Sequence, residues 1–133
     1  MDMKEKMEKL QELDHIYASL GSSFDVFKVS LQKMIKELEK GESIDLLKLF
    51  ACKYEYGTED EYGNTVFMHA VQKRQTEVLE TLWELAKDSK NQQEELLAQV
   101  WEEDVEGYTV FITVAYSRNV AVLKQLWEFA KNI

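Results

Sequence analysis

The sequence predicts an all-α protein made of repeated, stacked helix pairs. Apolar residues recur at three- and four-residue spacings along most of the chain, which is the spacing of one helical face. Proline, which interrupts helices, is absent from the 133 residues. A stretch that begins at Asp60 also recurs 44 residues later, beginning at Asp104. Such self-similarity is typical of helical-repeat architectures.

The first half of the chain predicts three helices. An apolar stripe over residues 1–20 ends at Gly21, and a second stripe over 24–38 ends at Gly41, because glycine commonly terminates helices. Ser43 is the N-cap expected for a short third helix, since a serine side chain accepts a hydrogen bond from the first turn. A chain of this length suits one core, so we expect a single domain.

The repeat covers residues 60–88 and 104–132 without a gap. From Asp60 to Lys87, 13 of 28 positions are identical in the two copies. Chance similarity between amphipathic helices does not preserve glycine, threonine and tryptophan positions together, so we interpret the stretches as copies of one structural unit. The identical residues are, in order, Asp, Gly, Thr, Val, Phe, Arg, Val, Leu, Leu, Trp, Glu, Ala and Lys.

Each copy begins with a predicted turn and a helix cap. Gly63 and Gly107 follow an acidic stretch, and a glycine there readily takes a positive φ. Thr65 and Thr109 come two residues later and are expected to cap the helix that follows. The sequence therefore predicts the same entry into a helix in both copies.

Each copy then predicts a short helix, a break and a longer helix. The short helices are expected over 66–73 and 110–117, and a break that begins at an arginine reverses the chain after each. The longer helix carries Trp83 in one copy and Trp127 in the other. We expect both rings to pack in the core or between repeats.

These units resemble the ankyrin repeat, whose pattern is Asp-x-x-Gly-x-Thr-Pro-Leu-His-x-Ala followed by a Val-x-x-Leu-Leu second helix. The chain is similar to this pattern over residues 60–70 and again over 104–114. Because the family's histidine is missing, its threonine–histidine hydrogen bonding is not expected here. The departures are Val66 and Val110 in place of the proline, and Met68 and Ile112 in place of the histidine.

The resemblance also implies an arrangement for the rest of the chain. The offset of 44 residues exceeds the family's roughly 33, and the surplus has apolar residues at helical spacing, which predicts an inserted helix over 91–102. Residues 24–53 are similar to a degenerate first repeat that lacks the Gly-x-Thr turn. Residues 1–20 then form a capping helix, which solenoids require at an open end. The expected architecture is an ankyrin-like solenoid over 1–133.

Charge and composition exclude several classes of partner. The chain has 25 acidic and 16 basic residues, and its net charge of −9 opposes binding to nucleic acid and to anionic membranes. We therefore expect a protein partner with a basic surface. The first nine residues lack the apolar stretch of a signal peptide, and Cys52 is a single cysteine, so we expect a cytoplasmic or nuclear protein.

Catalytic, metal and cofactor sites are not expected. His15 and His69 lie far apart in the sequence, and Cys52 has no second cysteine beside it, so ligands for a metal ion are too few. A glycine-rich phosphate loop, a nucleophile elbow and a metalloprotease motif are all missing from the sequence. We predict a protein without enzyme activity and without a cofactor.

The ankyrin resemblance implies a binding face for a partner protein. In that family the turn tips and the outer end of the first helix form a concave surface. Carried over to this chain, the surface mixes tyrosines with carboxylates, and tyrosine offers a large contact area at a small entropy loss. The positions are Glu61, Tyr62, Asn64, His69, Gln72 and Lys73 in one copy, and Val105, Glu106, Tyr108, Thr113, Tyr116 and Ser117 in the other.

Two functions of different classes follow. The first is a small adaptor or inhibitor that binds a partner protein through this face and has no chemistry of its own. The second is a structural protein that self-associates as a homodimer through an apolar C-terminal end. A pathogen-derived mimic of a host regulator and an arm of a longer ankyrin array are further alternatives. The residues expected at the apolar end are Val122, Leu126, Trp127, Phe129 and Ile133.

Overall fold

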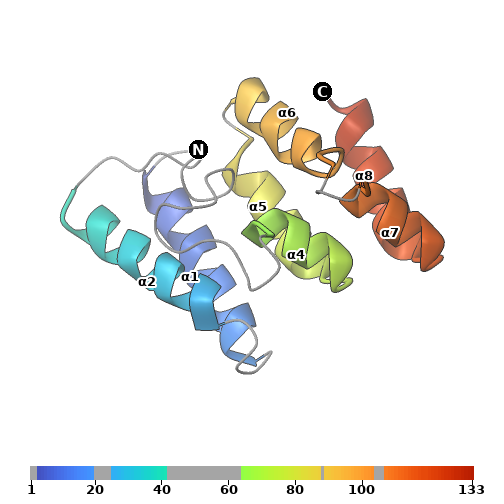
Figure 1. The fold of residues 1–133 in the computed structure, drawn as a ribbon. Coiled ribbons are helices and arrows are strands. Elements are labelled where there is room, and N and C mark those ends of the chain that lie inside the picture. The colour runs from blue at the N-terminus through green and yellow to red at the C-terminus, as the bar shows by residue number, and fades with distance from the viewer. Residues whose placement is uncertain (1–2, 20–24, 42–63, 88, 104–106) are drawn as a thin grey trace. The chain divides into compact units, whose positions relative to one another are not determined.

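The computed structural model describes residues 3–19, 25–41, 64–87, 89–103 and 107–133 (Figure 1). Every regular element within these ranges is an α-helix, which confirms the predicted all-α class for the described part of the chain. None of these helices is long and apolar enough to cross a membrane. The helices are α1 (Met3–Ser19), α2 (Asp25–Glu39), α4 (Val66–Gln72), α5 (Thr76–Leu85), α6 (Lys90–Gln99), α7 (Val110–Tyr116) and α8 (Val120–Lys131).

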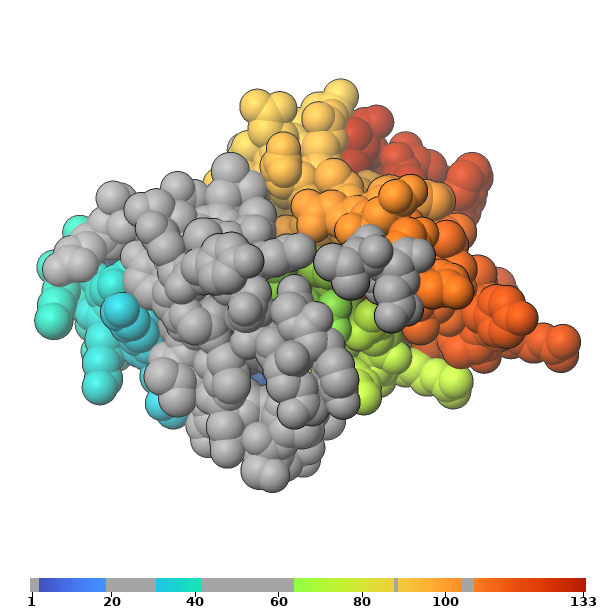
Figure 2. Space-filling model, viewed as in Figure 1, coloured from blue at the N-terminus to red at the C-terminus, as the bar shows by residue number. Residues whose placement is uncertain are grey.

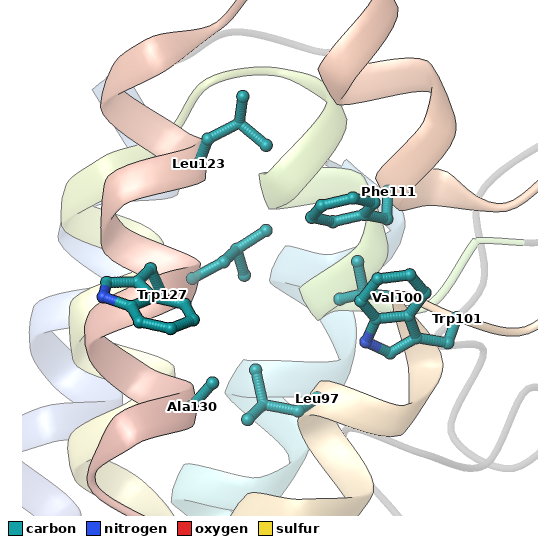
Figure 3. A pocket seen from close by; sticks show the side chains of 8 residues that line it. Leu97, Val100, Trp101, Phe111, Leu123, Trp127 and Ala130 are labelled. Carbon is teal, nitrogen blue, oxygen red and sulfur yellow. The ribbon is translucent and has the colours of Figure 1, made fainter.

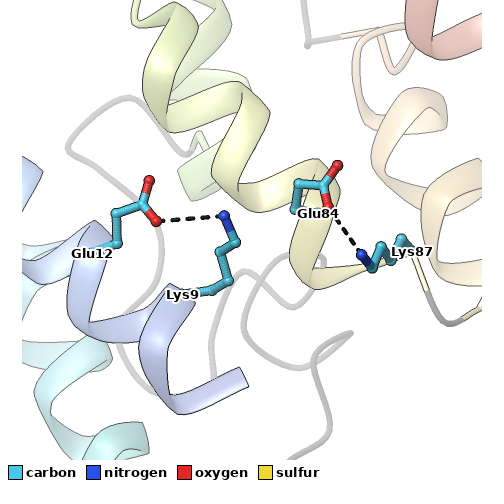
Figure 4. Close-up of polar contacts among 4 residues, drawn as sticks. All are labelled: Lys9, Glu12, Glu84 and Lys87. Atoms are coloured by element: carbon cyan, nitrogen blue, oxygen red, sulfur yellow. Dashed lines mark hydrogen bonds and ion pairs between the residues drawn. The ribbon is translucent and has the colours of Figure 1, made fainter. Parts of the chain in front are cut away.

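The chain forms two compact units, Met1–Val66 and Phe67–Ile133. In the first unit α1 packs against α2, and the apolar stripes of both helices provide buried side chains. On the outside of α1, Lys9 and Glu12 form an exposed ion pair at 3.5 Å (Figure 4), a kind of contact that contributes little to stability. The buried residues are Leu10, Leu13 and Tyr17 on α1, and Leu31, Met34 and Leu38 on α2.

Several predictions for the first half fall on residues that the structure does not describe. The third helix expected after Ser43 and the turn at Gly63 lie outside the described residues. The degenerate repeat expected over 24–53 is described only for 25–41, which contains α2.

The second unit repeats itself helix for helix. Both α4 and α7 have seven residues and begin at Val66 and Val110, and α5 and α8 begin at Thr76 and Val120. The helix starts therefore keep the offset of the sequence repeat, and α6 lies between the copies, in the surplus segment. An exposed ion pair recurs at the end of the longer helix, between Lys87 and Glu84 at 3.3 Å (Figure 4) and between Lys131 and Glu128 at 3.1 Å.

The break between the two helices of each copy is a turn with an arginine in the left-handed conformation. Arg74 has φ 60°, and its equivalent Arg118 has φ 57°. The N–H of Gln75 donates to the carbonyl of Ala70 at 3.0 Å, and the N–H of Arg74 donates to Val71 at 3.4 Å. This pair of bonds is the Schellman motif, which satisfies the last carbonyls of a helix. The second copy repeats both bonds, from Asn119 to Val114 at 3.4 Å and from Arg118 to Ala115 at 3.2 Å.

Replacing either arginine by glycine is expected to stabilise the second unit. A side chain at positive φ costs about 1–2 kcal/mol, and glycine removes this cost while it adds some entropy to the unfolded chain. We expect Arg74→Gly and Arg118→Gly each to raise the free energy of unfolding by about 0.5–1 kcal/mol, measured by urea unfolding. Lys73→Gly is the control, because its φ is not positive and the same change should lower stability.

The predicted turn and cap of the second copy are confirmed. Gly107 has a positive φ of 84°, and the side chain of Thr109 accepts a hydrogen bond from the N–H of Ile112 at 3.1 Å. The preceding N–H of α7, that of Phe111, donates to the carbonyl of Val100 at the end of α6, at 3.1 Å. The end of α6 is thereby joined to the start of α7.

Part of the core of the second unit lies where α8 packs on α5. The rings of Trp83 and Phe129 stack with centroids 4.4 Å apart and an interplanar angle of 13°. The side-chain amide of Gln125 donates to the carbonyl of Thr76 at 2.8 Å. The earlier residue of α8, Gln125, contacts the start of α5, and the later one, Phe129, contacts Trp83 further along α5. The two helices therefore run parallel. Each longer helix has a buried apolar face, with Val78, Leu79 and Leu82 on α5, and Val122, Leu126 and Phe129 on α8.

Candidate functional site

The predicted binding residues of the first copy that the structure describes are largely inaccessible. Asn64 and His69 are buried, and Gln72 is half-buried. Lys73, in the turn after α4, is exposed. Among the described positions of this copy, the accessible part of the predicted face thus lies at the end of α4 and in the turn that follows it. Four further positions lie outside the described residues, namely Glu61, Tyr62, Val105 and Glu106.

In the second copy the predicted tyrosines are exposed. Tyr116 on α7 is 89% exposed, and Tyr108, just before the N-cap, is 56% exposed. Ile112, which shares a face of α7 with Tyr116, is exposed as well. We call Tyr108, Ile112 and Tyr116 the tyrosine surface. Figure 2 shows the α7 segment, in orange, at the surface of this unit.

The two predicted hydroxyl residues of this copy are exposed but bonded to their own helix. The hydroxyl of Thr113 donates to the carbonyl of Thr109 at 3.3 Å. The hydroxyl of Ser117 donates to the carbonyl of Val114 at 2.8 Å. Their donors are therefore engaged, and the tyrosines provide most of the contact area that this part of the predicted face offers to a partner.

Exposed apolar side chains gather in the second copy and at the end of α6. Among the residues whose side-chain exposure the structure describes, which leaves out residues 25–30 of α2, Met3 is the one large apolar side chain exposed outside this region. Single exposed apolar residues are ordinary, whereas a group of them on one part of a protein marks an interaction site. The members of the group are Trp101, Tyr108, Ile112, Tyr116, Val120 and Trp127.

A pocket of about 520 Å³ opens between α6, α7 and α8. Figure 3 shows Trp127 on one side of it and the rings of Trp101 and Phe111 on the other. Those two rings stack with centroids 4.3 Å apart and an interplanar angle of 26°. We call this pocket the aromatic groove. It is lined by Leu97, Val100, Trp101, Phe111, Leu123, Leu126, Trp127 and Ala130, all of them without charge.

The aromatic groove is open in the second copy, although the equivalent side chains of the first copy are covered. Its α7 and α8 residues Phe111, Leu123, Leu126, Trp127 and Ala130 correspond in the repeat to Phe67, Leu79, Leu82, Trp83 and Ala86, all of which are buried. The expectation that both tryptophans pack inside is right for Trp83, which is 7% exposed, and wrong for Trp127, which is 67% exposed. The reason is that α8 covers Trp83, whereas no described helix covers Trp127.

The apolar C-terminal end expected from the sequence also needs correction. Val122, Leu126 and Phe129 are buried within the second unit, so they do not form an open end. Trp127 is exposed and Ile133 is half-buried. Sequence reasoning missed the contribution of α6, although the helical spacing of Leu97 and Trp101 was a usable signal for an apolar wall.

The aromatic groove is an apolar surface. The lining of the aromatic groove has no titratable side chain, so it can take an apolar group but offers no acid, base or nucleophile. Among the described residues, no three histidine, cysteine, aspartate or glutamate side chains are placed to hold a metal ion. No family model matches this chain, and comparisons with curated proteins and with solved structures find no match either.

Proposed function

We propose that this chain is a non-enzymatic protein-binding module, an adaptor or inhibitor, built as an ankyrin-like solenoid of stacked helix pairs. The two copies of the second unit support the repeat architecture, because they share helix starts, Schellman turns at Arg74 and Arg118, and ion pairs. In such an array each unit stacks on its neighbour, as α8 does on α5. A reducing compartment, the cytoplasm or the nucleus, suits a chain with one cysteine.

The exposed aromatic side chains carry the proposal of protein binding. Tyr108 and Tyr116 lie largely in water, on the short helix and turn that the ankyrin resemblance assigns to the binding face. Tyrosine is enriched among the residues that dominate binding energies at protein interfaces. An arrangement of this kind suits contact with another protein and not catalysis.

The charge of the chain indicates the kind of partner. A net charge of −9 attracts a basic protein surface and speeds its association. Because salt screens such attraction, we propose a partner whose association rate falls as ionic strength rises. The same charge is unfavourable for binding to nucleic acid and to anionic membranes.

Removing the two exposed tyrosine rings is expected to weaken partner binding about thirty-fold or more. Each truncation of a contact tyrosine removes roughly 1–2 kcal/mol of binding free energy. The measurement is affinity capture from native cell extract with the immobilised full chain, followed by titration of the captured protein against wild type and Tyr108→Ala/Tyr116→Ala.

The matched control is Tyr108→Phe/Tyr116→Phe, which keeps both rings and should keep most of the affinity. Equal affinity of the wild-type and double-alanine chains for the captured protein would remove the tyrosine surface from the binding site. A captured protein that binds equally well at low and at high salt would contradict the basic partner.

A further inference from the structure

The contact of α8 with α5 shows how the equivalent face of α8 can be covered. In the existing contact, Phe129 of α8 stacks on Trp83. Four residues earlier on α8, the amide of Gln125 donates to the carbonyl of Thr76 at 2.8 Å and reaches the carboxylate of Glu80 at 3.5 Å. The covering helix therefore uses a polar residue and an aromatic residue four positions apart, which lie on one face of a helix.

The second copy presents the same face with no described helix on it. Its tryptophan, Trp127, is 67% exposed and forms one side of the aromatic groove (Figure 3). Val120, the first residue of α8, and Lys124, which replaces the carboxylate, are also exposed. In the repeat, Thr76, Glu80 and Trp83 correspond to Val120, Lys124 and Trp127.

One position of this face has the opposite charge in the two copies. Glu80 accepts a hydrogen bond from the amide of Gln125, whereas Lys124 stands at the equivalent position of α8. A lysine ammonium only donates, so the side chain opposite it must accept. A carboxylate accepts this bond and supplies the complementary charge, which makes the bond stronger than one to a neutral group.

We propose that the aromatic groove is a docking site for an amphipathic helix of a partner protein, in which an acidic residue precedes an aromatic residue by four positions. The helix lies parallel to α8, with its carboxylate on Lys124 and its aromatic ring on Trp127. This site is additional to the tyrosine surface, so it does not depend on the proposed function of Tyr108 and Tyr116.

A second copy of the chain is a poor occupant of the groove. Its own covering residues, Gln125 and Phe129, already engage α5, and Phe129 is buried. A second copy could present them only if its α8 left α5. The other exposed aromatic residues of the described helices do not fit either, because the residues four positions before Tyr116 and Trp127 are Ile112 and Leu123.

A synthetic helix tests the proposal on the full-length chain. The probe is a labelled peptide of residues 118–133 of this sequence with Gln125→Glu, constrained as a helix by one side-chain lactam on its solvent face. We expect it to bind the chain in a fluorescence anisotropy titration. Trp127→Ala in the chain should weaken binding about ten-fold or more, as should Phe129→Ala in the peptide. Tyr116→Ala in the chain is the matched control and should leave binding unchanged.

The charge preference gives a second, independent measurement. The chain with Lys124 should bind the Gln125→Glu peptide better than a Gln125→Lys peptide, and Lys124→Glu in the chain should reverse this preference. Because Trp127 and Lys124 are exposed, the variants should keep the circular dichroism spectrum of the wild type.

Three results would overturn the proposal. The first is no binding of the Gln125→Glu peptide at a chain concentration of about 1 mM, the weak end of specific association. The second is binding that Trp127→Ala leaves intact, which would mean that the peptide replaces α8 on α5. The third is a Trp127-dependent dimer of the chain alone in sedimentation, which would make a second copy the occupant. None of these results bears on the tyrosine surface.

Discussion

Replacing Trp83 by alanine is expected to lower the free energy of unfolding of the second unit by about 3–5 kcal/mol, because it leaves a large cavity beneath Phe129. The same replacement at Trp127, its equivalent in the repeat, should change stability by no more than about 0.5 kcal/mol, since that ring lies in water. Urea unfolding followed by far-ultraviolet circular dichroism measures both.

This pair of variants isolates the effect of coverage, because the residue type, the helix and the position in the repeat are matched. Similar losses in the two variants would show that Trp127 is packed in solution. Such a result would contradict the open aromatic groove together with the difference between the copies. A small loss of stability in the Trp83→Ala variant would instead contradict the stacking of Trp83 on Phe129.

Alkaline pH is expected to destabilise the first unit through Tyr17. Tyr17 lies on α1 and is buried, and burial raises its pKa well above the ordinary value of 10.0. The unfolded chain ionises Tyr17 near pH 10, whereas the folded chain keeps it neutral. The contribution of the buried, neutral Tyr17 side chain to the free energy of unfolding is therefore fully present below pH 10. Above that value the free energy of unfolding falls by about 1.4 kcal/mol for each pH unit.

The measurement is the free energy of unfolding at a series of pH values from 8 to 12, which brackets the ordinary pKa of tyrosine at about 10. Tyr17→Phe should make the fall above pH 10 less steep, because phenylalanine has no proton to lose. Tyr116→Phe, which replaces an exposed tyrosine, is the control for removing a hydroxyl. If the Tyr17→Phe chain loses stability as steeply as the wild type, the pH dependence does not come from this buried side chain.

The helical class could be predicted from the sequence because it depends on local spacing. The apolar periodicity, the missing proline and the repeat were sufficient for the described helices, and Gly107 and Thr109 act as their residue types suggest. The left-handed turns were not predictable in this way, because Arg74 and Arg118 are not residues that favour positive φ. The repeated arginine was visible, but its backbone conformation depends on the helices on either side.

The candidate site was harder to predict, because exposure depends on neighbours and not on the repeat itself. Trp83 and Trp127 are identical in type and position in the repeat, yet among the described helices one covers Trp83 and none covers Trp127. Asn64 and His69 match positions of a binding face by pattern and are nevertheless buried. A sequence pattern locates a residue on a helix, but it does not say which other helix covers that residue.

The hydrogen bond from Phe111 to Val100 has a consequence for the entropy of binding at the aromatic groove. This bond joins the backbone of Phe111 to that of Val100, the residue before Trp101, and the rings of Phe111 and Trp101 stack on each other. Both rings of this wall are therefore held in place before a ligand arrives. A preorganised wall loses little conformational freedom on binding. Most of the ordering on association then falls on the incoming helix and on the exposed ring of Trp127, so stiffening that helix should raise its affinity.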